Sequence, residues 1–225
     1  MEMIIMYLKD GKKRLDGIKK NSHEYRAWNF GQQIIGVDEV GRGCLAGPVI
    51  AAAVALKIGK ISPLLKDSKL LSAIQREKAF GWIVQNGSYG IGIINHTTID
   101  MVNIWQATLK AMKQAVLNLG AQLTDRPESI IVDAMPLTMS NTAYHETPVH
   151  HFPFAESKSN SIAAASIVAK ITRDRLMGQM DRYFNHYKFA QNKGYGTKCH
   201  RNALKDYGHC IVHRTSFHVK ELEYA

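Results

Sequence analysis

The feature that most constrains the fold of this chain is an uninterrupted apolar run at residues 49–56. The run is made of alanine, leucine and β-branched side chains, and the Gly47-Pro48 turn marks its start. A strand with one face in water alternates apolar and polar residues, whereas a strand covered on both faces does not. We therefore expect residues 48–56 to form a strand whose two faces are both buried.

The rest of the chain alternates between strands and helices. A helix from about residue 97 has an apolar stripe at helical spacing, which is typical of a helix that faces a core. A helix is also expected at 73–85, where Ser72 and Gln75 form a capping-box pattern. The order strand, strand, helix, strand, helix, strand, helix predicts an α/β layered domain with a mixed sheet. The other expected elements are strands at 32–37, 89–95 and 129–133, a helix at 159–184, and Thr97 or Thr98 as the cap of the long helix.

Two adjacent carboxylates follow the first expected strand. Asp38 and Glu39 come directly after residues 32–37, and a tight Gly-Arg-Gly turn follows at 41–43. Two acids at the rim of a sheet need a cation, a role in proton transfer or a salt bridge. Two glycines around an arginine let a backbone approach a flat anion while a cation reaches it. The pattern favours a metal beside a phosphate, although such an acid pair by itself is more often a solvated strand end.

A third acid, Asp133, ends another short strand. In open α/β sheets, ligand sites form beyond the ends of strands. If the strands of Asp38 and Asp133 are neighbours, three carboxylates meet, and their mutual repulsion demands a divalent metal. Hard oxygen ligands without a His or Cys cluster favour Mg²⁺ or Mn²⁺ over zinc. Two such ions about 4 Å apart would suit hydrolysis of a phosphodiester.

The composition agrees with a polyanionic partner. The chain has 225 residues, of which 45% are hydrophobic, and a formal net charge of +10. That length allows one sizeable core, and the basic balance is expected of a protein that binds nucleic acid. The three cysteines lack CxxC spacing, which disfavours a disulfide framework or a zinc site. Because no apolar run approaches the roughly 20 residues of a membrane span, we expect a soluble cytoplasmic protein that does not contact a membrane.

Several separate motifs follow one another along the chain. They are Gly36-Val37-Asp38-Glu39-Val40-Gly41-Arg42-Gly43, Leu45-Ala46-Gly47-Pro48-Val49, Asp67-Ser68-Lys69, Ile131-Val132-Asp133, the alanine-rich run 161–170, Thr172-Arg173-Asp174-Arg175, Lys193-Gly194-Tyr195-Gly196-Thr197 and His213-Arg214-Thr215-Ser216-Phe217. In this order they resemble the signature of ribonuclease HII, the type 2 ribonuclease H. The resemblance covers about residues 24–219, and it is specific because several separate motifs occur in the same order as in the family.

The resemblance implies an RNase H-like fold, with a five-stranded mixed sheet flanked by helices and a C-terminal helical extension. It implies an endonuclease that uses two Mg²⁺ or Mn²⁺ ions. The expected substrates are RNA/DNA hybrids and DNA duplexes that contain ribonucleotides. The expected cut lies 5′ of a single ribonucleotide and leaves 5′-phosphate and 3′-hydroxyl ends. We expect a monomer with a basic lead-in at 1–32, a catalytic domain at 33–185 and a substrate-contacting segment at 186–225 packed on that domain.

The resemblance also implies four catalytic acids that bind metal. Three of them match the family pattern, and the fourth departs from it. The family usually reads Lys-Gly-Asp where this chain has Phe154-Ala155-Glu156, so Glu156 replaces an aspartate. The longer carboxylate of Glu156 can bind the metal only if the ion or the adjoining helix shifts. Asp174 is the alternative fourth acid, although we expect it to form an ion pair on its own helix. Ala134 also replaces a glycine that is common in the family, which concerns the backbone beside the acid. The four acids are Asp38, Glu39, Asp133 and Glu156.

Other positions match the substrate-binding residues of the family. Tyr195 matches the aromatic residue that stacks on the sugar of the next deoxynucleotide. The turn matches the one that senses the 2′-hydroxyl, which alone distinguishes RNA from DNA at a single position. Phosphate contacts are expected from the loop before residue 72 and from the start of the helix expected at 159–184. At the start of that helix, capping of the helix is the alternative role. The expected substrate-binding residues are Gly41, Arg42, Gly43, Ser68, Lys69, Ser159 and Tyr195.

Three alternatives remain open at the level of sequence. The related ribonuclease HIII typically has Gly-Lys-Gly and a longer N-terminal domain, whereas this chain has Gly-Arg-Gly. A hybrid-binding module that has lost catalysis would show its loss at Glu156. A resolvase or transposase on the same fold would prefer branched DNA and would ignore the 2′-hydroxyl.

Overall fold

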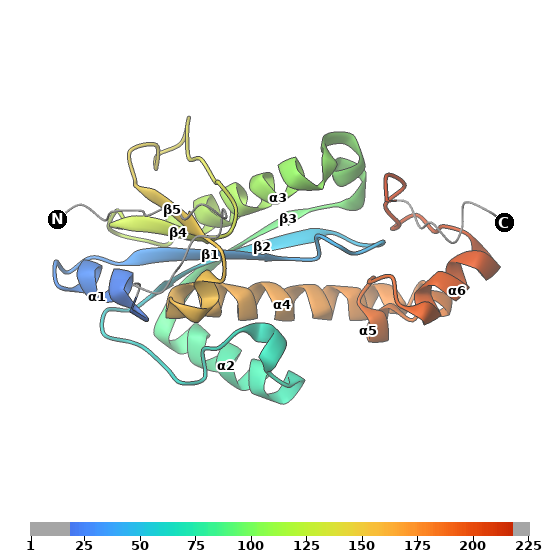
Figure 1. Ribbon diagram of the computed structural model, residues 1–225, viewed down its shortest axis with the longest axis horizontal. Helices are drawn as coiled ribbons and strands as arrows, with labels where there is room; N and C mark the ends of the chain where they lie inside the picture. The colour runs from blue at the N-terminus through green and yellow to red at the C-terminus, as the bar shows by residue number, and fades with distance from the viewer. Residues whose placement is uncertain (1–18, 218–225) are drawn as a thin grey trace, which may run out of the picture.

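A computed structural model describes residues 19–217 of the chain. Its strands are β1 (Ile34–Val40), β2 (Val49–Leu56), β3 (Gly87–Ile94), β4 (Ser129–Asp133) and β5 (Val149–Phe152). They form one sheet in the order β3-β2-β1-β4-β5 (Figure 1). β2 runs antiparallel to β1 and β3, whereas β4 runs parallel to β1 and β5. The predicted mixed sheet is therefore confirmed.

Helices cover both faces of this sheet. Figure 1 shows α3 on one side, and α2 and α4 on the other, with α5 and α6 beyond the far end of α4. Among the helices within residues 19–217, none has both the length and the apolar content needed to cross a membrane. The helices are α1 (Ser22–Trp28), α2 (Ala73–Asn86), α3 (His96–Gly120), α4 (Asn160–Asp181), α5 (Phe189–Asn192) and α6 (Lys198–Tyr207), with short 3₁₀ turns η1 (Ser68–Leu70), η2 (Ala155–Ser157) and η3 (Asn185–Tyr187).

The apolar run of β2 is buried on both faces, as its sequence predicts. Every second residue from Val49 to Ala55 packs into a core with the apolar stripe of α3. The alternate residues Ala52, Val54 and Leu56 pack into a second core with α2 and α4. Since successive side chains of a strand point to opposite faces, one continuous apolar run supplies both cores.

α4 lies unusually close to β1, and this closeness positions the segment before α4. A Cβ at Gly36 would overlap the backbone of Ser161 and Ile162 at the start of the helix. The alanines that follow, at 163–165, are fully buried against the sheet. Small residues on both sides therefore let the helix begin beside the centre of β1.

The C-terminal part packs on the far end of α4. Met177 of α4 forms a small core with Phe189 of α5, Leu204 of α6 and Val212. This core is separate from the two that cover the sheet. Residues 218–225 of the predicted C-terminal segment, and residues 1–18 of the predicted lead-in, lie outside the described residues.

Several local predictions differ from the structure. The cap of α3 is Asn95, whose side chain accepts from the Thr98 N–H, so the prediction of Thr97 or Thr98 was wrong. A serine, threonine or asparagine can each fill this position, and the pattern alone did not separate them. α3 is also interrupted at Asn103, where φ is 65° and ψ is 165°. Finally, α1 forms inside the segment predicted as a basic lead-in.

Candidate active site

Two of the predicted acids lie side by side because their strands are neighbours. β1 and β4 pair in parallel with Val37 opposite Val132, so the next residues, Asp38 and Asp133, lie together at the same end. Asp38 is only 8% exposed. The strand extends further than predicted, to Val40, so Asp38 lies within β1 and not beyond its end.

Burial and mutual repulsion perturb these carboxyl groups. Burial, followed by repulsion from Glu39 and Asp133, raises the pKa of the Asp38 carboxyl well above its usual range. Burial also raises the pKa of Glu39, even though the Arg42 guanidinium lies 3.5 Å from its Oε1. Acids held together at this energetic cost stay ionised when a cation neutralises them.

Glu156 reaches the same place from a different part of the chain. It lies in η2, and the Ala155 N–H of that turn donates to Asp133 Oδ1 at 2.9 Å. Burial, followed by repulsion from Asp133, raises the pKa of the Glu156 carboxyl. The turn is thus tied to Asp133 and places a fourth carboxylate beside it.

The oxygen donors of this group fit a divalent cation. Glu39 Oε2 and Glu156 Oε2 are buried and have no hydrogen-bond partner within the described residues. A buried carboxylate oxygen without a partner is costly, and a hard cation is a suitable partner for it. Within residues 19–217, no three His, Cys, Asp or Glu side chains are close enough together to bind one metal ion in their present conformations. Asp38 and Asp133 lie at the same end of the neighbouring strands β1 and β4, with Glu39 next to Asp38 and Glu156 beside Asp133.

The Gly-Arg-Gly turn follows β1 directly. Gly41 has φ of 94°, and a Cβ there would overlap the Arg173 side chain, so only glycine fits. Gly43 is different, because a Cβ built there would meet nothing within 4 Å. The protein itself does not require glycine at 43, whereas a ligand that approaches the backbone closely would. The guanidinium of Arg42 lies 5.9 Å from the ring centre of Trp105.

Tyr195 lies next to this turn. Its backbone forms an antiparallel bridge with Cys44, the residue that follows Gly43. The Tyr195 side chain is 38% exposed. Burial and the neighbouring Cys44 thiol raise the pKa of its hydroxyl to about 12, so the ring stays neutral at physiological pH. A partly exposed, neutral aromatic ring beside a backbone turn can stack on a sugar or a base.

The expected phosphate contacts differ in accessibility. Lys69 is exposed, but Ser68 is buried and its Oγ lies 2.9 Å from Ser166 Oγ. Ser166 in turn hydrogen-bonds to Asp38. Ser159 is fully buried, caps α4 by accepting from the Ile162 N–H, and donates to Glu24. The capping alternative is therefore the role that the structure shows for Ser159, and its hydroxyl does not reach the surface.

Two further predictions can be compared with the structure. Asp174 forms an ion pair with Lys170 at 2.9 Å on α4, as expected for an acid that supports its helix. Ala134, beside Asp133, has φ of 54°, a left-handed conformation that suits the glycine common in the family. The local backbone therefore keeps the shape that a glycine would adopt.

Sequence reasoning missed four residues that support the site. Glu24, Arg173 and Arg214 are almost completely buried, and Ser166 touches Asp38. The two arginines and Ser166 belong to motifs quoted above, which is the signal that could have found them. Nothing in the local pattern indicated that Glu24 of α1 accepts from the Ser161 N–H at the start of α4.

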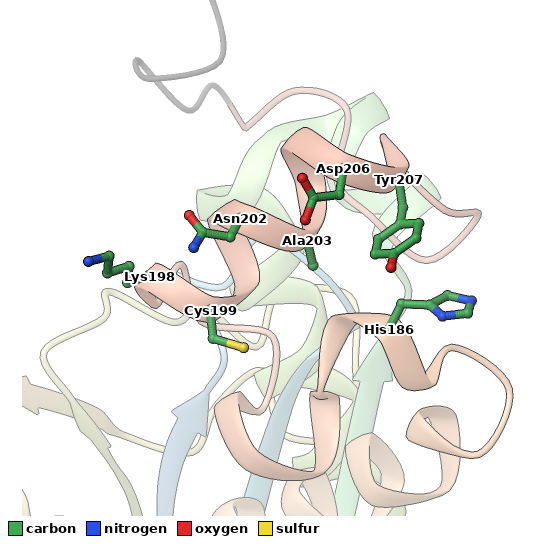
Figure 2. Close-up of a pocket in the computed structure, with 7 residues that line it drawn as sticks. All are labelled: His186, Lys198, Cys199, Asn202, Ala203, Asp206 and Tyr207. Atoms are coloured by element: carbon green, nitrogen blue, oxygen red, sulfur yellow. The ribbon is translucent and has the colours of Figure 1, made fainter.

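A separate surface pocket of about 590 Å³ lies among the C-terminal helices (Figure 2). In Figure 2 the side chains of α6 and His186 surround it. None of the acids described above lines it, so it does not belong to the carboxylate site. Its lining residues are His186, Lys198, Cys199, Asn202, Ala203, Asp206 and Tyr207.

Comparison with known proteins identifies the family of this chain. The sequence model of the Ribonuclease HII family matches residues 35–220. The chain belongs to the ribonuclease HII family. It is 45% identical to the ribonuclease HII of Syntrophus aciditrophicus over 88% of this chain and 90% of that protein. It is 40% identical to that of Lactobacillus acidophilus over 96% of this chain and 84% of that protein.

Solved structures show the same fold. A ribonuclease HII from Archaeoglobus fulgidus, solved in complex with PCNA, superposes with a TM-score of 0.68 at 24% identity, over 84% of this chain and 96% of that one. A ribonuclease HIII in complex with Mn²⁺ gives a TM-score of 0.63 at 23% identity, over 79% of this chain and 63% of that one. These structures show that the chain has the RNase H-like fold. Its membership of the family shows that it is a type 2 ribonuclease H, which is a hydrolase. Metal dependence is typical of its family.

Proposed function

We propose that this ribonuclease HII hydrolyses the RNA strand of RNA/DNA hybrids and cuts 5′ of single ribonucleotides in duplex DNA. The cut leaves 5′-phosphate and 3′-hydroxyl ends. One observation carries the proposal: a group of four acids, a backbone turn with an open Gly43 and a partly exposed Tyr195 lie together in the fold. The acids supply the chemistry, and the turn with Tyr195 supplies recognition.

The acids would hold two divalent cations, Mg²⁺ or Mn²⁺. Asp38 is buried and its carboxyl is repelled by Glu39 and Asp133, so it would hold the cations together with those two acids. Glu39 and Glu156 each contribute a buried oxygen that has no hydrogen-bond partner within the described residues. Bound cations would activate water and stabilise the leaving 3′ oxygen. The positions of the carboxylates would thus select the phosphate that is cut.

Recognition would depend on the sugar. The exposed Gly43 leaves room for a ribose to approach the backbone, and the only chemical mark of that ribose is its 2′-hydroxyl. Tyr195, bridged to Cys44, would lie against the next sugar along the strand. Lys69 is exposed and would contact the phosphate backbone.

The test is cleavage of a labelled DNA duplex that contains one ribonucleotide, with Mg²⁺, with Mn²⁺ and with a chelator. An identical all-DNA duplex is the control. We expect a metal-dependent cut on the 5′ side of the ribonucleotide and none in all-DNA. Cleavage of branched DNA without regard to the 2′-hydroxyl would contradict the proposal and favour a resolvase.

The same assay tests the alternative that the sequence left open, an inactive hybrid-binding protein, which rests on Glu156 being longer than the usual aspartate. It predicts tight binding of hybrid with chelator present and no cut with either metal. Replacing Glu156 by aspartate would then create activity that the natural chain lacks. If the natural chain already cuts, this alternative is excluded.

A further inference from the structure

Two arginines are buried beneath the Gly-Arg-Gly turn at residues 41–43. Arg173 is 0% exposed and Arg214 is 1% exposed. Neither guanidinium forms an ion pair with a carboxylate in residues 19–217, where the ion pairs involve other residues. Burying a charge without a counter-ion costs several kcal/mol unless hydrogen bonds compensate for it. The hydrogen bonds of these two side chains must therefore compensate for the cost of burying their charges.

All of those hydrogen bonds go to backbone carbonyls. Arg214 donates from Nη2 to the Gly41 carbonyl at 2.7 Å, from Nη1 to that of Arg42 at 2.9 Å, and from Nε to that of Gly47 at 3.0 Å. Arg173 donates to the Pro48, Ala46 and Lys193 carbonyls at 2.7–3.1 Å. The planar guanidinium presents five N–H groups in a rigid fork, which an ammonium cannot reproduce.

The bonds of Arg214 determine which way the turn faces. The described chain has no cis peptide bonds. In a trans peptide, a carbonyl and the following N–H point in opposite directions. Because the Gly41 and Arg42 carbonyls point at Arg214, the N–H groups of Arg42 and Gly43 point away from it. Neither N–H has a hydrogen-bond partner among the described residues, and Gly43 is exposed.

The segment that carries Arg214 is itself anchored. Asp100 of α3 accepts from the N–H and hydroxyl groups of Thr215 and Ser216 at 2.5–3.0 Å. The Arg214 N–H donates to the Leu45 carbonyl at 2.8 Å, which adds a backbone link to the same loop. The segment that carries Arg214 is therefore tied both to α3 and to the loop that follows the turn.

We propose that Arg214 is a positioning residue for ribose recognition, because it holds the carbonyls of Gly41 and Arg42 and so directs the next two amide N–H groups toward the bound sugar. The proposal rests on the proposed function, in which this turn senses the 2′-hydroxyl. Arg214 touches no substrate in this arrangement and acts only through the backbone. Its loss should therefore affect sugar discrimination more than contacts with phosphate.

The test compares binding with chelator present, so that nothing is cut. Affinities are measured for a duplex with one ribonucleotide and for the identical all-DNA duplex, and their ratio is the sugar preference. Arg214→Lys keeps the charge but not the fork, and Arg214→Ala leaves a cavity that methylguanidinium can fill. Arg175→Lys is the matched control, because Arg175 forms an exposed ion pair with Glu77.

We expect Arg214→Lys to lower the sugar preference about tenfold, the scale of one hydrogen bond in recognition. Affinity for all-DNA should stay unchanged. Methylguanidinium should restore the preference of Arg214→Ala, and Arg175→Lys should behave like the natural protein. Folded variants that keep the natural preference, or that lose affinity for both duplexes equally, would overturn the proposal.

A measurement on the natural protein removes the dependence on folded variants. The amide resonances of Arg42 and Gly43 should shift with the ribonucleotide duplex and much less with all-DNA. Equal shifts would overturn the positioning role. If the natural protein binds both duplexes equally, the proposed function fails as well, which distinguishes that result from a failure confined to Arg214.

Discussion

At the scale of single residues, Glu156 is the point where this chain departs from its family. Its carboxylate lies beside Asp133, with Oε2 buried and without a hydrogen-bond partner among the described residues. Glu156→Gln removes one charge from the metal-binding group, so we expect the cleavage rate to fall by about 100-fold or more.

Asp38→Asn should abolish cleavage while binding of the substrate persists.

Asp174→Asn is the control for the prediction about Glu156→Gln. Asp174 pairs with Lys170 and lies outside the acid group, so its loss should change the rate only a few-fold. Single-turnover cleavage of one substrate by all three variants decides the matter. A natural rate in Glu156→Gln, or an equally large loss in Asp174→Asn, would move the fourth role away from Glu156.

The two glycines of the turn should respond differently to alanine. Gly41→Ala forces a Cβ into Arg173 at a left-handed φ, so we expect a loss of stability of about 2–4 kcal/mol. Gly43→Ala meets open space, so stability should stay within about 0.5 kcal/mol, the usual range for surface changes. Denaturant unfolding measures both effects.

Gly43→Ala should nevertheless reduce binding of the ribonucleotide duplex. The added methyl group would occupy the space through which a sugar approaches the backbone. An unchanged affinity in this stable variant would show that the substrate does not come close to residue 43.

Ala134 adopts a conformation better suited to glycine. Its φ of 54° costs roughly 1–2 kcal/mol for an alanine. Glycine would relieve that strain but lose roughly 0.4–1 kcal/mol through greater freedom of the unfolded chain. We therefore expect Ala134→Gly to stabilise the protein by about 0.5–1 kcal/mol. Denaturant unfolding would contradict this if the variant were less stable than the natural protein.

At the scale of elements, two histidines join α6 to the segment after it. The Cys210 N–H donates to His213 Nδ1 at 2.9 Å, so the proton of neutral His213 lies on Nε2. That nitrogen lies 3.0 Å from His200 Nε2, which leaves His200 Nδ1–H to donate to the Tyr195 carbonyl at 2.9 Å. The chain of bonds needs both rings neutral, and it ends at the backbone of Tyr195.

This histidine pair should make stability depend on pH. Burial, followed by repulsion from His200, lowers the pKa of His213 to about 4, and burial lowers the pKa of His200. In the unfolded chain a histidine has a pKa of about 6.5, so between about pH 6.5 and 4 the unfolded state binds more protons at His213 than the folded state does. The stability from neutral His213 is thus complete above pH 6.5 and is lost as the pH falls toward 4.

The prediction is a shallower pH dependence of unfolding free energy in His213→Gln than in the natural protein. The difference should lie below pH 6.5 and approach one proton for His213. His145→Gln is the control, because the His145 side chain is 58% exposed. Equal slopes in His213→Gln and the natural protein between pH 7 and 5 would contradict the assignment.

At the scale of the whole molecule, three segments that are distant in the sequence meet at the turn after β1. The turn after β1 is bridged to Tyr195 through Cys44, and to His213 through Ala46. Tyr195 and the turn therefore form one surface, on which a ribose and the next sugar would lie in succession. A duplex with one ribonucleotide offers a ribose followed by a deoxyribose at one place, whereas the RNA strand of a uniform hybrid has no such junction.

We expect Tyr195→Ala to reduce cleavage of the single-ribonucleotide duplex by about tenfold or more, the scale of losing one aromatic stack. Cleavage of a uniform hybrid should fall less. Tyr195→Phe keeps the ring and should retain most activity, and Tyr183→Ala, at an exposed tyrosine, controls for general effects. An equal loss on both substrates would reject the role of Tyr195 at the junction.

Much of the fold could be predicted from local patterns. The double burial of β2, the stripe of α3 and the capping box of Ser72 and Gln75 all depend on residues within one element. The prediction that Asp38 and Asp133 meet needed one further condition, that β1 and β4 are neighbours, and the pairing confirms it.

What the sequence by itself determined was four of the five strands, the three long helices, the acids at the ends of two strands and the family. These follow from residue order, because periodicity and motifs are properties of near neighbours in the chain. Only the tertiary structure decided that Arg214 holds the turn, since Arg214 and Gly41 are 173 positions apart. The same is true of Glu24, which binds the start of α4 from 137 positions away. Such contacts form only when buried polar groups must find partners inside the packed chain, and no local pattern records which partners they find.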